Sequence, residues 1–413
     1  MAPEDQVPAR AAAETAARDA YGRLLGLLSR RTGDLAGAED ALSGAFEAAL
    51  RAWPEGGVPD QPEAWLLTAA RRRLTDADRR AAVRRAAEPA LTVLADEAAA
   101  RQPPDWPDER LALMTACARP EIEPAMHAPL MLQVVLGLDA TRIASAFLVK
   151  PATMGQRLSR AKARIREAGL AFERPPPDQL AKALEPVLDA IYAAYGAGWD
   201  GSGAGEAAVR GLTEEAGFLA GLAARLAPHS GEAHGLVALI AHCQSRAHAR
   251  REASGAFVPL EDQDPQAWNA DLIALGETAL RRALTCGPPG RFALEAAIQS
   301  VHAERRVTGR TNWPAAAALY DALMATGRAG MGAAVARASA HGRAFGAARA
   351  LAELEALADA GQDYQPFHAA RGHWRAAAGD VCGARAAYAR AAALSADPAV
   401  RRFLQARRDA LNA

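Results

Sequence analysis

Apolar residues recur at the three- and four-residue spacing of a helix along most of the chain. The segment AEDALSGAFEAALRAW shows the pattern well, because one apolar stripe runs along it, made of Leu42, Phe46, Ala49, Leu50 and Trp53. We find no convincing pair of segments with the two-residue alternation of neighbouring strands. The pattern therefore predicts an all-α protein.

Proline-rich segments divide this helical pattern. Residues 86–108 contain QPPDWPD and read as a linker. The segment FERPPPDQ marks a second boundary, because three consecutive prolines cannot continue a helix. We therefore expect a domain at 18–86, a linker at 87–108, a second domain at 109–170 and a helical extension at 178–413.

Residues 140–167 predict a helix-turn-helix. The first helix, TRIASAF, would pack through Ile143, Ala144 and Phe147. Pro151 suits the first turn of the second helix, where a missing N–H does no harm. The second helix would bury an inner face made of Met154, Leu158, Ala161 and Ile165.

The opposite face of that second helix carries hydrogen-bond donors, namely Thr153, Gln156, Arg157, Arg160 and Arg164. Arginine makes bidentate bonds to guanine, and glutamine reads adenine, so this face predicts a recognition helix. Arg142, Lys150, Lys162 and Arg166 are expected at backbone phosphates. A solvated amphipathic helix pair without a nucleic-acid role is the alternative for the same pattern.

The last third of the chain shows a weak repeat of small and larger apolar residues. Its three copies are Ala316/Tyr320/Leu323, Ala347/Leu351/Leu354 and Ala384/Tyr388/Ala391. They are 31 and 37 residues apart, on either side of the about 34 residues of a tetratricopeptide repeat (TPR). We therefore interpret the extension as a TPR-like helical array.

Basic residues are concentrated in two segments of the chain. The chain has no net charge, yet residues 140–167 hold seven basic residues and one acid, and residues 71–85 hold seven arginines and two acids. A neutral chain argues against diffuse nucleic-acid binding and leaves room for two local basic surfaces. Four widely spaced cysteines, and no apolar run long enough for a signal peptide or a membrane span, favour a cytoplasmic protein.

Catalytic chemistry finds little support in the sequence. Phosphate-loop, nucleophile-elbow and zinc-protease motifs are absent. His234, His242, Cys243 and His248 could be imagined as metal ligands, but ordinary packed or exposed histidines are favoured. The acidic run LEDQD at 260–264 is expected to form internal salt bridges, with Arg246, Arg250 and Arg251 as candidate partners, rather than a ligand site. We expect no catalytic residues, cofactor or metal, and therefore not an enzyme.

Two long segments resemble sigma factors of the extracytoplasmic-function (ECF) type, in the subgroup with a C-terminal TPR-like extension. GDLAGAEDALSGAFEAALRAWPEGGVPDQPEAWLLTAARRRLTDADRR is similar to region 2 of that subgroup. DERLALMTACARPEIEPAMHAPLMLQVVLGLDATRIASAFLVKPATMGQRLSRAKARIREAG is similar to its region 4. The extension resembles it through VPLEDQDPQAWN, FALEAAIQSVHAE and NWPAAAALYDAL.

The resemblance implies a promoter-specificity subunit of bacterial RNA polymerase. Region 2 would bind the β′ clamp helices of core polymerase and the −10 element, and region 4 would read the −35 element and contact the β flap. Carried over to this sequence, the −10 residues are Arg72, Arg73, Asp76, Arg79 and Arg80. The polymerase-binding residues are Glu39, Asp40 and Phe46. A protein regulator is expected at the C-terminal extension.

A second hypothesis comes from a different class of protein. Ser43 and Gly44 stand where the family usually has glutamine and an acid, on the helix face expected to contact polymerase. The chain would then be a sigma-derived, helical-repeat interaction module that no longer opens promoters. A metal-dependent enzyme is a remote third hypothesis.

Overall fold

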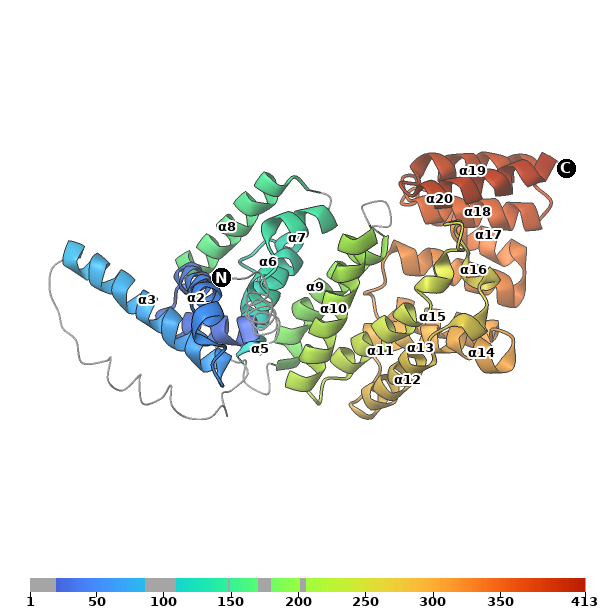
Figure 1. Ribbon diagram of the computed structural model, residues 1–413. Coiled ribbons are helices and arrows are strands. Elements are labelled where there is room, and N and C mark those ends of the chain that lie inside the picture. The colour runs from blue at the N-terminus through green and yellow to red at the C-terminus, as the bar shows by residue number, and fades with distance from the viewer. Residues whose placement is uncertain (1–19, 86–108, 148, 170–179, 201–205, 413) are drawn as a thin grey trace. The chain divides into compact units, whose positions relative to one another are not determined.

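The computed structural model describes residues 20–85, 109–147, 149–169, 180–200 and 206–412. Helices make up these ranges almost entirely, and they contain no strand, only an isolated bridge between Arg251 and Phe257 (Figure 1). The predicted all-α fold is confirmed. Within the same ranges, no helix is long and apolar enough to cross a membrane. The linker expected at 87–108 lies outside the described residues.

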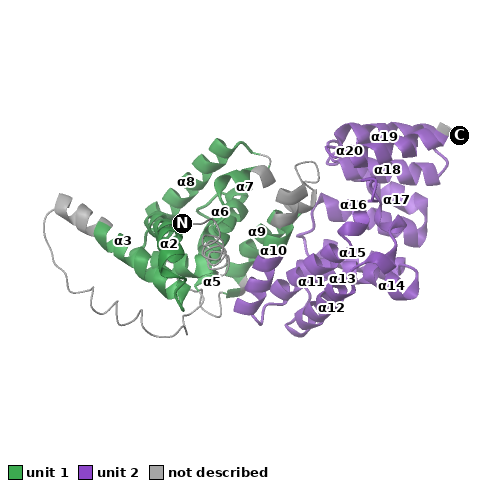
Figure 2. Ribbon diagram, viewed as in Figure 1, with its two compact units in different colours: residues 1–200, 207–216 green, residues 201–206, 217–413 purple. Residues whose placement is uncertain are grey.

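The chain forms two compact units (Figure 2). Unit 1 comprises Met1–Asp200 and Ala207–Ala216, and unit 2 comprises Gly201–Glu206 and Gly217–Ala413. Sequence patterning places the start of the extension at residue 178, whereas unit 1 continues beyond that position.

The first part of unit 1 is a helix over residues 20–32, followed by α2 (Leu35–Gly56) and α3 (Pro62–Arg85). Asp34 begins α2, because its side chain accepts the N–H of Ala36. Leu42, Ala49 and Trp53 are buried as predicted, but Leu50 is 49% exposed. The apolar stripe is therefore narrower than the sequence suggests, because Leu50 lies at its edge.

The second part of unit 1 comprises α5 (Arg110–Cys117), α6 (Pro124–Leu136), α7 (Ala140–Ala146), α8 (Pro151–Glu167) and α9 (Leu180–Asp200). Gly137 ends α6 in a left-handed conformation, with φ 68° and its N–H donated to Gln133 O. Helix α9 packs on α5 and α6 and buries Val187 and Ile191. This apolar contact is the reason that the first helix of the predicted extension belongs to unit 1.

Unit 2 contains most of the extension. The elements of this part of the chain are α10 (Glu206–Leu226), α11 (Gly231–Ser245), η2 (His248–Arg250), η3 (Leu260–Asp262), η4 (Pro265–Ala267), α12 (Ala270–Thr285), α13 (Arg291–Ala303), α14 (Arg305–Thr308), α15 (Trp313–Ala325), α16 (Met331–Phe345), α17 (Ala347–Glu355), α18 (Gln365–Ala377), α19 (Val381–Leu394), α20 (Pro398–Asp409) and η5 (Ala410–Asn412). Consecutive helices from α15 to α20 contact one another, as expected for a helical array (Figure 1).

Small residues let the helices of this array approach closely. A methyl carbon at Gly342 of α16 would lie 2.5 Å from Cζ2 of Trp374 on α18, and one at Gly372 of α18 would lie 2.8 Å from Cδ1 of Tyr388 on α19. The pattern residues Ala316, Ala384 and Ala391 are fully buried. The repeat positions therefore form helix–helix contacts, while membership of the TPR class stays a prediction.

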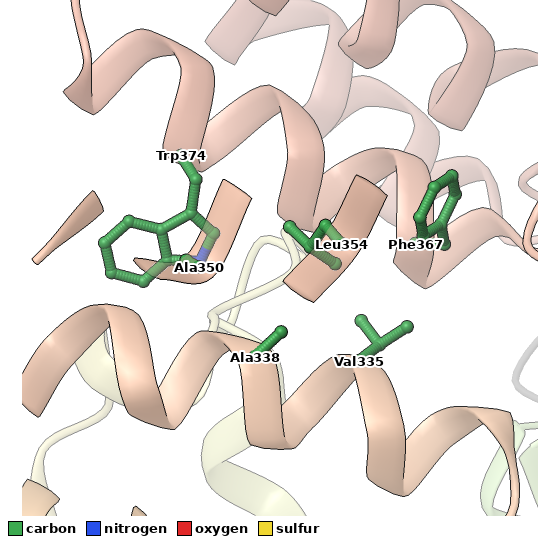
Figure 3. Close-up of a cluster of buried hydrophobic side chains, with 6 residues drawn as sticks. All are labelled: Val335, Ala338, Ala350, Leu354, Phe367 and Trp374. Atoms are coloured by element: carbon green, nitrogen blue, oxygen red, sulfur yellow. The ribbon is translucent and has the colours of Figure 1, made fainter. Parts of the chain in front are cut away.

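The core between α16, α17 and α18 combines small and large side chains (Figure 3). Trp374 points from α18 toward α16, and its Nε1–H donates to Ser339 Oγ at 3.4 Å. The buried members of this cluster are Val335, Ala338, Ala350, Leu354, Phe367 and Trp374. The fixed indole contributes to the wall of a cavity described below.

Candidate nucleic-acid interface

Helices α7 and α8 form the predicted helix-turn-helix. Asp139 begins α7, because its Oδ1 accepts the N–H groups of Thr141 and Arg142, both at 2.9 Å. In the turn, the N–H of Val149 donates to Ala144 O at 2.9 Å. Pro151 occupies the first turn of α8 as predicted. Leu148, at the centre of the turn, lies outside the described residues.

The inner face of α8 is the predicted one. Met154, Leu158, Ala161 and Ile165 are all buried, and α8 packs against α7, α6 and α2. Apolar residues at this spacing place every polar side chain of the helix on its other faces. The orientation of the candidate recognition surface therefore follows from the packing of four side chains.

The outer face of α8 carries an unopposed positive charge. Arg157, Arg160 and Arg164 are exposed, and within the part of the chain that the structure describes none of them pairs with a carboxylate. Gln156 is exposed beside them, while Thr153 is half-buried. Three guanidinium groups and an amide on one helical face form a surface that can donate to phosphates and base edges.

Two other cations of this region, for which phosphate contacts are predicted, are paired with carboxylates of the chain. Lys162 Nζ donates to Glu39 Oε2 at 2.5 Å, and both side chains are 15% exposed. Arg142 lies 3.7 Å from Glu215 Oε1. The spacing of cations on one helix cannot reveal such partners, because Glu39 and Glu215 are distant in the sequence.

Helix α3 carries the predicted −10 residues. Arg72 and Asp76 are exposed, while the side chains of Arg79 and Arg80 lie outside the described residues. The guanidinium of Arg73 lies against α2 at Gly44, where a methyl carbon would come within 2.6 Å of Nη1. Glycine at position 44 therefore makes room for Arg73 across the α2–α3 contact, a role that the sequence did not indicate.

The predicted polymerase-binding residues of α2 are not equally accessible. Asp40 is exposed, whereas Glu39 is engaged by Lys162. Phe46 is half-buried and stacks on Tyr21, with ring centroids 6.3 Å apart. Burial, followed by the charges of Glu39 and Asp40, raises the pKa of Tyr21 well above its usual range. The structure thus gathers these residues around one tyrosine.

Close helix contacts join the N-terminal helix of unit 1 to its second part. A methyl carbon at Gly22 would lie 2.3 Å from Val135 O, and one at Gly26 would lie 2.7 Å from Glu109 Cβ. Arg30 Nη1 donates to Glu109 Oε1 at 2.7 Å. The sequence analysis missed this contact, although glycines four residues apart on one helix face were a visible signal.

The histidines considered as metal ligands have other partners. His234 Nε2 lies 3.1 Å from Pro228 O, and His242 Nε2 lies 3.4 Å from Glu277 Oε1. Burial lowers the pKa of His242, which opposes the effect of Glu277. Among the residues that the structure describes, no group of three or more His, Cys, Asp or Glu is arranged to hold a metal ion.

Two segments of the chain match known family models. Residues 17–84 match the family model described as Sigma-70 region 2. Residues 183–284 match a model described as a family of unknown function, DUF6596. No solved structure matches the chain.

A full-length relative extends this similarity beyond the two matched segments. An uncharacterized protein of Rhizobium meliloti (strain 1021) is 34% identical over 396 residues, which cover 94% of this chain and 93% of the relative. The match to Sigma-70 region 2 shows which family the N-terminal part resembles. The chain therefore belongs to the family of this Rhizobium meliloti protein, and it is a sigma-70 family factor whose region 2 is followed by a helical C-terminal region.

Proposed function

We propose that this chain is an ECF-type promoter-specificity subunit with a TPR-like regulatory extension, acting in the cytoplasm. A sigma-70 region 2 implies interaction with core RNA polymerase and promoter DNA. In the proposal, α2 and α3 contact the β′ clamp helices and the −10 element. Helices α7 and α8 read the −35 element and contact the β flap, and the C-terminal helices modulate both activities.

The observation that carries the proposal is the outer face of α8. Its 17 residues extend over about 25 Å, and the three exposed arginines span two of its turns. A major groove about 12 Å wide admits one helix. Because no carboxylate of the described chain neutralises this face, its charge is available to the phosphates and guanines of a duplex.

Promoter selection tests this assignment. We expect Arg157→Ala and Arg160→Ala each to weaken use of a cognate promoter by about tenfold or more, the cost of a lost bidentate base contact. Promoters would first be identified by transcribing genomic fragments with reconstituted polymerase, and each variant would then be assayed on them. Arg281→Ala, which removes an exposed arginine of α12, is the matched control.

Two outcomes would contradict the recognition-helix assignment. One is unchanged promoter selection by both α8 variants. The other is an equal loss with Arg281→Ala, which would point to a general effect of net charge instead of a specific helix face.

The second hypothesis, a sigma-derived interaction module, is favoured by one observation. Glu39, expected at the polymerase interface, is held by Lys162. If this ion pair persisted in every state of the protein, the polymerase contact would be lost. Core binding together with transcription from a fork-junction promoter separates the two proposals, because the module hypothesis expects no transcription from such a template.

A further inference from the structure

Unit 2 contains a cavity of about 410 Å³ between its C-terminal helices. Its walls come from the loop at residues 259–262 and from α13, α15, α16, α18, α19 and α20. A volume of this size lies within the range of about 300–1,000 Å³ that is usual for sites of small organic ligands. None of the sigma-factor roles proposed above uses this cavity.

Aromatic rings and alanines form a large part of the lining. Five rings face it, those of Trp313, Tyr320, Trp374, Tyr388 and Phe403. Alanines of α16 and α18, including Ala336 and Ala369, stand where larger side chains would fill the space. Flat rings around a hollow with alanine walls favour a ligand with a planar apolar body.

Two arginines, Arg343 and Arg407, line the cavity. Arg343 lies over the rings of Trp313 and Trp374, at 5.9 and 5.5 Å from their centroids, and Arg407 lies over Phe403 at 5.8 Å. Stacking on an aromatic ring orients a guanidinium group. The N–H groups at the edge of the guanidinium plane can still donate hydrogen bonds.

Two carboxylates and two guanidinium groups line the cavity, namely Glu261, Asp262, Arg343 and Arg407, and they are not paired one to one. The Glu261 carboxylate accepts hydrogen bonds from Nε of Arg343, at 3.0 Å, and from its Nη2. These bonds also hold residues 259–262 in place as one wall of the cavity. Asp262 lies in the field of Arg305, whose Nη1 donates to Leu260 O at 3.0 Å. Arg407 is exposed and has no carboxylate partner in the part of the chain that the structure describes, so its guanidinium is open to an anion.

The histidines of the cavity do not add to this charge at neutral pH. Burial, followed by the charges of Arg343 and Arg407, lowers the pKa of His373 to about 4. His302 is similarly lowered, chiefly by burial. His373 therefore offers the cavity a neutral imidazole as a hydrogen-bond partner.

From these features we infer that the cavity binds a small aromatic carboxylate, with its ring between the aromatic walls and its carboxylate at Arg407. The apolar body replaces water against the rings, and the anion supplies the charge that Arg407 lacks within the chain. The inference is independent of promoter recognition, since it concerns residues of unit 2 alone.

A series of probes with one body and different charges tests this inference. We would titrate the full chain with 1-naphthaleneacetate, 1-naphthaleneacetamide and 2-(1-naphthyl)ethylamine by isothermal titration calorimetry. The carboxylate should bind about tenfold or more tightly than the amide, the value of one charge-assisted hydrogen bond. The amine should bind more weakly still, because like charges repel.

Variants then locate the binding site. Arg407→Gln should reduce carboxylate affinity by about tenfold while leaving the amide unchanged. Arg402→Gln, an exposed arginine on the same helix outside the lining, should change neither. Ala336→Leu should weaken both probes by filling the cavity, and a thermal melt by circular dichroism would show that this variant still folds.

Three results would each overturn the inference. The first is that no probe binds at millimolar concentration. The second is equal affinity for the carboxylate and the amide. The third is binding that survives both Arg407→Gln and Ala336→Leu, which would place the carboxylate elsewhere on the protein.

Discussion

The ion pair between Glu39 and Lys162 gives the most direct test of how α2 and α8 are held together. The perturbation is a double-mutant cycle made of Glu39→Gln, Lys162→Met and the double variant. The two charged atoms are 2.5 Å apart, and both side chains are 15% exposed. The pair therefore lies between an exposed ion pair, worth about 0–1 kcal/mol, and a fully buried one, whose breakage costs about 3–5 kcal/mol.

We expect a coupling energy of about 1–2 kcal/mol, equivalent to about 5- to 30-fold in an equilibrium constant. Hydrogen exchange of α2 and α8 amides, measured by mass spectrometry, should accelerate by that factor in each single variant. If polymerase uses Glu39, Lys162→Met should also tighten core polymerase binding, because the carboxylate is released.

Arg51 and Glu47 provide the control, since they form a 3.5 Å ion pair on α2 with side chains 78% and 65% exposed. Arg51→Met should leave exchange unchanged, because solvent screens such a pair. A coupling energy near zero between positions 39 and 162 would refute the reasoning, since it would mean that the two charges do not interact in solution.

Two further predictions concern packing and protonation. Gly342→Ala should destabilise unit 2 by about 2 kcal/mol, because its methyl group would overlap Trp374. Gly155→Ala on α8, with open space around it, should stabilise its helix by about 0.5–1 kcal/mol. Urea unfolding, with the two units followed separately, measures both changes in the free energy of unfolding, and equal changes would contradict the geometry. Burial and neighbouring arginines lower the pKa of His302 from 6.5 to about 4. The unfolded chain therefore binds a proton at His302 more tightly than the folded chain does. The folded state accordingly loses stability as the pH falls from 6.5 toward 4, by about 1–2 kcal/mol at pH 5. His302→Gln should flatten that pH dependence, and an unchanged slope would count against a buried neutral imidazole.

The sequence predicted well those features that depend on local periodicity. The inner face of α8 and the proline at its start both follow from rules spanning a few residues. The exposure of Arg157, Arg160 and Arg164 then follows from that inner face. Leu50 was misplaced because it lies at the edge of its stripe, where burial depends on the neighbouring helix.

Features that join distant parts of the chain were not predicted. Glu39 and Lys162 are 123 residues apart, and Arg343 and Glu261 are 82 apart, so no spacing rule connects either pair. The acidic run at 260–264 was correctly expected to be fixed by arginines, but Arg305 and Arg343 bind it, while Arg251 pairs with Asp397. Gly44 was read as a departure from a family pattern, and its contact with Arg73 required coordinates.

The packing of α9 on α5 and α6 determines where the chain can be truncated without exposing its core. A truncation at the proline run before residue 178 would remove a helix that buries Val187 and Ile191, and so leave the bundle of α5 to α8 with an exposed apolar surface. Aggregation of such a fragment would be an artefact of the chosen end point and would say nothing about regulation. A stop codon after Leu226, which keeps all of unit 1 and the whole of α10, is the cleaner way to ask what the remaining helices contribute.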